Sequence, residues 1–211
     1  LSGAFFLTFA AKMQSQFSTY LELGFNHILD LEGYDHILFL VALCAIYSLK
    51  HWKQVAILVT AFTIGHSLTL ALAALDVIRV SAKWIEFLIP VTILATSLYN
   101  VISRPDPELN QDKKWRINYL LALGFGLIHG LGFSNFLRSM LMPGEEDSLV
   151  SQLFAFNVGV ELGQLGIVAI ILGLAFTFTH LLRVKTLDWN LFISGMAAGP
   201  ALIMCLERIP F

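Results

Sequence analysis

Histidines and carboxylates occur inside apolar stretches of this sequence, where an ionisable side chain is costly and indicates a function. These residues are His27, Asp30, Asp35, His36, His66, Glu86, His129 and Glu161. Two or three imidazoles with one or two carboxylates suit a divalent transition metal, because imidazole binds Zn, Cu, Fe and Ni and a carboxylate offsets the charge of the ion. We therefore predict five metal ligands: Asp35, His36, His66, His129 and Glu161.

The spacing of neighbouring polar residues supports a shared site. Asn157, Glu161 and Gln164 are spaced i, i+4 and i+7, so they lie on one face of a helix. Asn157 and Gln164 then have the role of orienting the ligands. Two roles stay open. His27 either takes part in the site or makes a local contact, and Glu86 either supports the site or is solvated near the membrane surface.

The predicted ligands also share a depth. His66 lies about 11 residues, or about 16 Å at the helical rise, from the outer end of its apolar stretch. His129 and Glu161 each lie about 12 residues from the outer end of theirs, and Asp35 and His36 open a stretch on the same side. Unrelated polar residues are not expected at one level, so we predict a site in the outer half of the protein.

Membrane-spanning helices must position these residues. The 211-residue chain is 57% hydrophobic and 13% charged, whereas a soluble domain is about 25% charged. A spanning helix needs about 20 mostly apolar residues, and the stretches that approach this length are 34–49, 55–77, 85–102, 117–141, 149–182 and 191–206. The first of them begins near Tyr20 if Gly33 only bends the helix.

The predicted fold is therefore all-α: a polytopic membrane helical bundle of about six transmembrane helices plus an N-terminal interfacial helix. Residues 20–211 form the single bundle, and polar residues interrupt residues 1–19, which we interpret as a peripheral or interfacial helix.

The distribution of basic residues predicts the orientation through the positive-inside rule. One set of loops carries Lys50, Lys53, Arg104, Lys113, Lys114, Arg116, Arg183 and Lys185, and the opposite set carries Lys12, Arg79, Lys83, Arg138 and Arg208. This bias predicts a multi-pass protein of the bacterial inner membrane with both termini in the periplasm. His51 and His180 then lie near cytoplasmic span ends, as interfacial residues.

The net charge of −2 argues against a nucleic-acid partner, which requires a clustered basic surface. The predicted partners are the lipid bilayer and the metal ion, and an oligomer is compatible with the sequence.

The sequence around these residues resembles the HupE/UreJ family of bacterial membrane proteins. The matching stretches are 24–28 (GFNHI), 33–40 (GYDHILFL), 62–70 (FTIGHSLTL), 125–133 (FGLIHGLGF) and 156–164 (FNVGVELGQ), and Glu86 matches the acid that opens the family's third span. The interval between His27 and Asp35 is two residues longer than the commonest family spacing. The resemblance implies a permease for nickel or cobalt that serves hydrogenase and urease maturation.

Two functions remain open at this point. The first is transport of a divalent transition metal, nickel foremost, through the His/carboxylate site. The second is an intramembrane zinc-dependent hydrolase acting on a lipid or lipid-linked substrate, in which zinc lowers the pKa of a bound water to about 7. Asp35 or Glu161 would then be the general base, and Ser67 would assist. Enzyme activity is the less favoured alternative, and the bound ion is nickel or zinc.

The cytoplasmic halves of the predicted spans bear on this choice. A permease needs polar groups between its site and the cytoplasmic face. Residues 55–59 and 167–175 are apolar, which counts against a simple pore.

Overall fold

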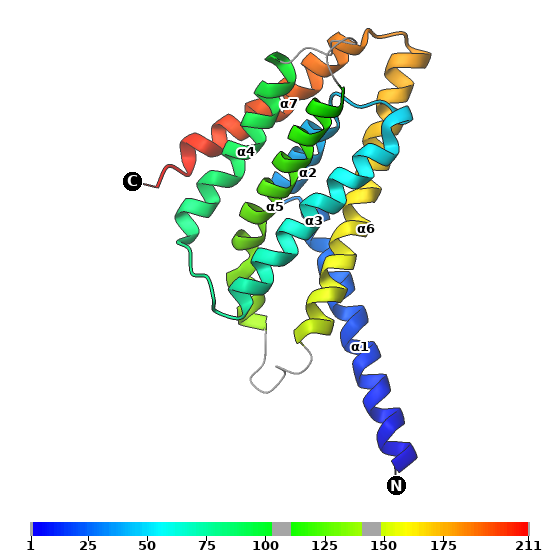
Figure 1. The fold of residues 1–211 in the computed structure, drawn as a ribbon, viewed down its shortest axis with the longest axis vertical. Helices are drawn as coiled ribbons and strands as arrows, with labels where there is room; N and C mark the ends of the chain where they lie inside the picture. The colour runs from blue at the N-terminus through cyan, green and yellow to red at the C-terminus, as the bar shows by residue number, and fades with distance from the viewer. Residues whose placement is uncertain (1, 103–110, 141–148, 211) are drawn as a thin grey trace.

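A computed structural model describes residues 2–102, 111–140 and 149–210, and the side chains of residues 14–102, 116–133 and 149–210. The described residues form helices and no strand (Figure 1), so the all-α prediction is confirmed. The helices are α1 (Ser2–Leu29), α2 (Asp35–Cys44), η1 (Leu49–His51), α3 (Trp52–Ala74), α4 (Ala82–Ile102), α5 (Gln111–Met140), α6 (Leu149–Phe176), η3 (Thr177–Leu181) and α7 (Thr186–Glu207).

Four helical segments are long and apolar enough to cross a membrane: Leu49–Ala74, Ala82–Ile102, Leu149–Leu181 and Thr186–Glu207. Many of their exposed residues are large and apolar, and several of their polar residues are buried. In α3, for example, Ile64 and Leu68 are more than half exposed, whereas His66 is fully buried. A surface of this kind matches lipid better than water. Over the described part of the chain, the predicted number of about six spans is not confirmed.

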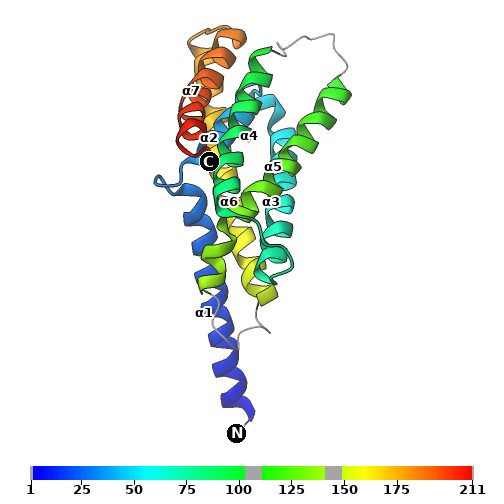
Figure 2. The same ribbon diagram turned by 90° about the vertical axis from the view of Figure 1, so that its left-hand side faces the viewer.

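The helices pack as three close pairs, α3 with α5, α1 with α6 and α4 with α7. The short helix α2 lies inside the bundle and packs against α4, α6 and α7 (Figures 1 and 2). The ten residues of α2 are fewer than the predicted stretch 34–49, because the helix ends at Cys44 and the chain turns before η1.

The helical conformation is interrupted between α1, which ends at Leu29, and α2, which begins at Asp35, at the level of the predicted site. The last turn of α1 packs against the middle of α6, where Ile28 lies beside Gly163. Helix α2 then begins at Asp35 and lies further along the long axis of the bundle (Figure 1). Gly33 therefore does not merely bend one long helix. Irregular backbone at membrane depth is tolerated where it lines a cavity, and such broken helices are common around transporter sites.

Helix α1 is continuous across the predicted boundary between residues 19 and 20. Its N-terminal part extends beyond the other helices in both views of the ribbon (Figures 1 and 2). The peripheral or interfacial position of residues 1–19 stays a prediction.

Glycine allows the close approach of α3 and α5. A Cβ atom at Gly126 would overlap the backbone carbonyl of Phe62, and one at Gly130 would overlap the carbonyl of His66. Backbone atoms cannot be displaced without moving the helix, whereas a flexible side chain can change its rotamer. Only glycine therefore permits this contact.

Gly126→Ala is therefore expected to destabilise the protein by about 1–3 kcal/mol, the usual cost of overpacking. The measurement is the thermal unfolding midpoint in detergent. Gly124→Ala is the matched control, because a Cβ at Gly124 meets no atom within 4 Å. Equal midpoints for the two variants would contradict the close contact.

Candidate metal centre

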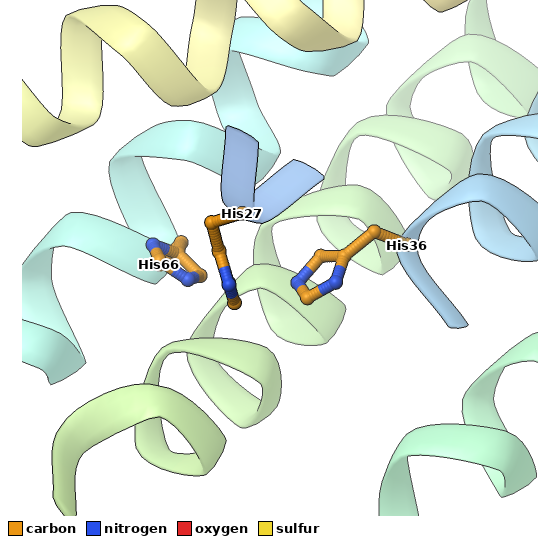
Figure 3. A group of neighbouring side chains, drawn as sticks. All are labelled: His27, His36 and His66. Carbon is orange, nitrogen blue, oxygen red and sulfur yellow. The ribbon is translucent and has the colours of Figure 1, made fainter. Parts of the chain in front are cut away.

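Three histidines from three different helices converge inside the bundle. They are His27 in the last turn of α1, His36 in the first turn of α2 and His66 in the middle of α3. One ring nitrogen from each lies within 4.8 Å of the other two. Figure 3 shows the His27 side chain between those of His66 and His36. Three imidazole nitrogens at this separation could hold one metal ion.

A fourth histidine, His129 of α5, adjoins this group. Its ring centroid lies 5.2 Å from that of His36. Its Nδ1 lies 2.8 Å from the carbonyl oxygen of Phe125, one turn earlier in the same helix. This contact favours the tautomer with a proton on Nδ1, which leaves the lone pair of Nε2 available to a metal.

The Nε2 atoms of these four histidines share one property. Each is buried and has no hydrogen-bond partner among the described residues. A buried polar atom without a partner costs about 1–3 kcal/mol, so four of them at one place indicate a ligand that would satisfy them. A metal ion matches them, because it accepts the lone pairs of several imidazoles at once.

Asp35 supplies the carboxylate nearest to the histidines. It lies in the first turn of α2, where its Oδ1 accepts the backbone N–H of His36 at 2.8 Å. The same oxygen lies 2.9 Å from Nδ1 of His36. A carboxylate at this position orients the imidazole and increases its basicity as a ligand.

A cavity of about 180 Å³ opens beside the histidines. Its lining includes the break between α1 and α2, the beginning of α4 and the end of α7. The charged residues of the lining are Asp30, Asp35, Glu86 and Arg208. A cavity with three carboxylates and one guanidinium attracts cations. A more open hollow of about 520 Å³, lined in part by Asn26 and Asp30, also reaches His27.

The comparison with known families agrees with the motifs around these histidines. The model of the family described as HupE / UreJ protein matches residues 6–206. The chain belongs to the HupE/UreJ family. This family is associated with the transport of nickel and cobalt. No curated protein and no solved structure gives a significant match.

In this HupE/UreJ protein, Glu161 and Gln164 of α6 contact threonines of α3. Glu161 accepts a hydrogen bond from Thr60 Oγ1 at 2.6 Å, and Gln164 accepts one from Thr63 Oγ1 at 2.9 Å. Thr60 lies six residues before His66, about 9 Å along the helix axis. The role of Glu161 as a direct ligand stays a prediction.

Two further predicted residues have local partners in the HupE/UreJ chain. The Asn157 side chain donates to the carbonyl of Leu153 at 2.7 Å, and the same side chain adjoins the ring of His66. The Ser67 hydroxyl donates to the carbonyl of Thr63 at 2.6 Å. Ser67 therefore bonds to its own helix in this structure, and its assistance to catalysis is not tested.

Sequence reasoning missed or left open two residues of the HupE/UreJ site. His27 was left open, and it lies in the centre of the group because α1 ends beside α2 and α3. Arg208 was counted only as a basic residue of the outer side, and it lines the cavity with the acids. The only feature of the sequence that pointed to this position was the distribution of basic residues, which put Arg208 on the same side of the membrane as the predicted site.

Proposed function

We propose that this protein transports a divalent transition metal, nickel foremost, across the bacterial inner membrane. The observation that carries the proposal is the convergence of four buried, unpartnered imidazole Nε2 atoms beside an acid-lined cavity. His27, His36 and His66 bind the ion, with His129 and Asp35 beside them. The bilayer interior offers a bare ion no compensation for its lost water, so the protein must supply it.

The proposed path begins at the periplasmic face. The ion enters the cavity between Asp30 and Glu86, where the carboxylates lower the energy of a cation, and then reaches the imidazoles. In the proposed topology α1 and α2 form one broken crossing and α3 to α7 form five more, which makes six. The distribution of basic residues supports both termini on the periplasmic side.

A zinc-dependent hydrolase is the second candidate, and one observation favours it. Three imidazoles beside an open cavity are also the arrangement of a catalytic zinc, which keeps one position for water. Asp35, which lines the same cavity, is then the candidate general base.

Metal uptake into vesicles separates the two candidates. The purified protein is reconstituted into liposomes that contain a fluorescent chelator, and Ni²⁺ or Zn²⁺ is added outside. Transport predicts uptake well above that of protein-free liposomes. Stoichiometric metal binding without uptake would contradict transport and favour the hydrolase, and the absence of stoichiometric binding would contradict both.

The two candidate carboxylates are expected to differ. Asp35→Asn should weaken Ni²⁺ binding by about 10–100-fold, the usual effect of losing a carboxylate that orients a ligating histidine. Glu161→Gln should weaken it less, because the Glu161 carboxylate is already bonded to Thr60. Titration calorimetry of both variants measures this difference. An equal or larger loss in Glu161→Gln would restore Glu161 as a principal ligand.

A further inference from the structure

A second, smaller cavity lies beyond the metal centre, toward the end of α2 that is distant from His36. It measures about 10 Å³, room for a single water molecule. Its polar lining consists of Thr96, Tyr99, Asn100 and Asn118, and the rest is apolar. It contains no charged residue, in contrast to the cavity on the periplasmic side of the histidines.

One face of α5 leads from the metal centre to this cavity. His129, Phe125, Ala122 and Asn118 follow one another at intervals of four, three and four residues, so they share a face of the helix. The distance along the axis from His129 to Asn118 is about 16 Å. Asn118 lies two residues after Arg116, in the direction of the proposed cytoplasmic face.

Helix α4 provides a second polar route in the same direction. Thr92, Thr96 and Asn100 follow one another at intervals of four residues, and all three are buried. Thr92 lies one turn from Ile89, which lines the periplasmic cavity, and Asn100 lines the small one. The hydroxyls of Thr92 and Thr96 donate to the carbonyls of Ile89 and Thr92 in their own helix, and their oxygens still have lone pairs to offer a cation.

An aromatic layer separates the histidines from the small cavity. It consists of Phe39, Phe62 and Phe125. The ring of Phe39 lies 4.9 Å from that of Phe62 and 5.8 Å from that of Phe125, centroid to centroid. Phe62 lies 5.1 Å from the His129 ring. Phe125 adjoins both the histidines and the small cavity. Its carbonyl oxygen contacts Nδ1 of His129, and Phe125 also lines the small cavity.

Hydrogen bonds hold the two amides of the small cavity in place. Asn118 Nδ2 donates to the hydroxyl of Tyr47 at 2.8 Å, and Asn100 Nδ2 donates to the carbonyl of Ala42 at 2.7 Å. Both bonds use amide nitrogens, whereas a cation requires the amide oxygens. The amides are therefore positioned by the protein before any ion arrives.

We propose that the small cavity is a second binding station for the transported divalent cation, reached when Phe125 moves aside. This inference rests on the proposed transport function. Neutral amide and hydroxyl oxygens bind nickel or zinc more weakly than imidazole does, so an ion that passes the aromatic layer moves to a weaker site. Release requires such a site, because conduction fails where binding is too tight to leave.

The test uses Asn118→Leu in the full-length protein. We expect Ni²⁺ uptake into liposomes to fall at least tenfold while Ni²⁺ affinity in detergent stays within twofold of the wild type, because the histidines are distant. Tyr47→Phe removes only the hydrogen bond to Asn118 and should keep most of the uptake. Leu120→Ala is the matched control, since Leu120 lies exposed on the same helix.

Phe125→Ala provides an independent measurement with the opposite sign, since opening the aromatic layer should raise the uptake rate several-fold. Unchanged uptake in Asn118→Leu would overturn the second station, and so would an equal loss in Tyr47→Phe. Wild-type protein that binds Ni²⁺ without uptake would instead overturn the proposed transport function.

Discussion

His66→Ala is expected to weaken Ni²⁺ binding by at least about 100-fold and to abolish uptake. Loss of a residue that merely supports a ligand already costs about 10–100-fold, and His66 is proposed as a direct ligand. It is fully buried, and one of its ring nitrogens lies within 4.8 Å of a ring nitrogen of His27 and of one of His36. Titration calorimetry and liposome uptake measure the two effects.

His180→Ala is the matched control for this variant. His180 is exposed in η3, and its Nδ1 contacts the hydroxyl of Thr179. We expect wild-type binding and uptake from it. A His66→Ala protein that binds nickel as tightly as His180→Ala would contradict the proposed centre.

Metal removal gives a second readout of the same variant. An ion that binds only the folded state, at 100 times its dissociation constant, stabilises that state by about 2.7 kcal/mol. The wild type should therefore unfold at a lower temperature after chelation, and His66→Ala should show no such shift. The unfolding temperatures of the two metal-free proteins are also compared. If they are similar, His66→Ala is folded and has lost only its ligand; a much lower value for His66→Ala indicates a misfolded protein.

Glu86→Lys is expected to lower the rate of Ni²⁺ uptake at least tenfold. Glu86 lines the cavity beside the histidines, together with Asp30, Asp35 and Arg208. Reversal of its charge puts a second cation beside Arg208 and removes one of three carboxylates. Charge in a cleft changes the rate of association by about 10–1,000-fold, so the main effect should be on the initial rate at low metal concentration.

Ionic strength and a neighbouring variant control this experiment. The difference between Glu86→Lys and the wild type should shrink as salt is raised, because salt screens exposed charges. Lys83→Gln changes a charge in the same part of α4, at an exposed residue outside the cavity lining, and should leave the rate unchanged. An equal loss from both variants would show that the cavity does not guide the ion.

The histidines of the centre could be predicted because the cost of burying an ionisable group in lipid does not depend on the details of packing. His36, His66 and His129 were identified from this cost together with their shared depth, and the structure brings their rings together. His27 could not be assigned in the same way. The position of His27 depends on how the chain turns between α1 and α2. The extra length of the interval between His27 and Asp35 does not show in which direction the chain turns.

Helix rotation limited the prediction for α6. The spacing of Glu161 and Gln164 correctly put them on one side of the helix, and both contact threonines of α3. Spacing within a helix does not determine which neighbour that side faces, because this depends on how the helices pack.

The half of the protein that we propose faces the cytoplasm shows the same limit. Residues 55–59 and 167–175 are apolar, as the sequence shows, and they counted against a pore. Polar side chains at that depth are instead contributed by α4, by α5 and by Tyr47. Only the structure brings these segments together, so the objection from the apolar spans does not hold for the whole bundle.

X-ray absorption at the nickel K edge tests the central claim most directly, which is that imidazoles from α1, α2 and α3 bind one ion. Wild-type protein with one equivalent of Ni²⁺ should show the outer-shell scattering of at least three imidazoles. His27→Ala should show one imidazole fewer, and His180→Ala should match the wild type. Nickel surrounded by oxygen alone, or an unchanged spectrum in His27→Ala, would contradict the proposed centre.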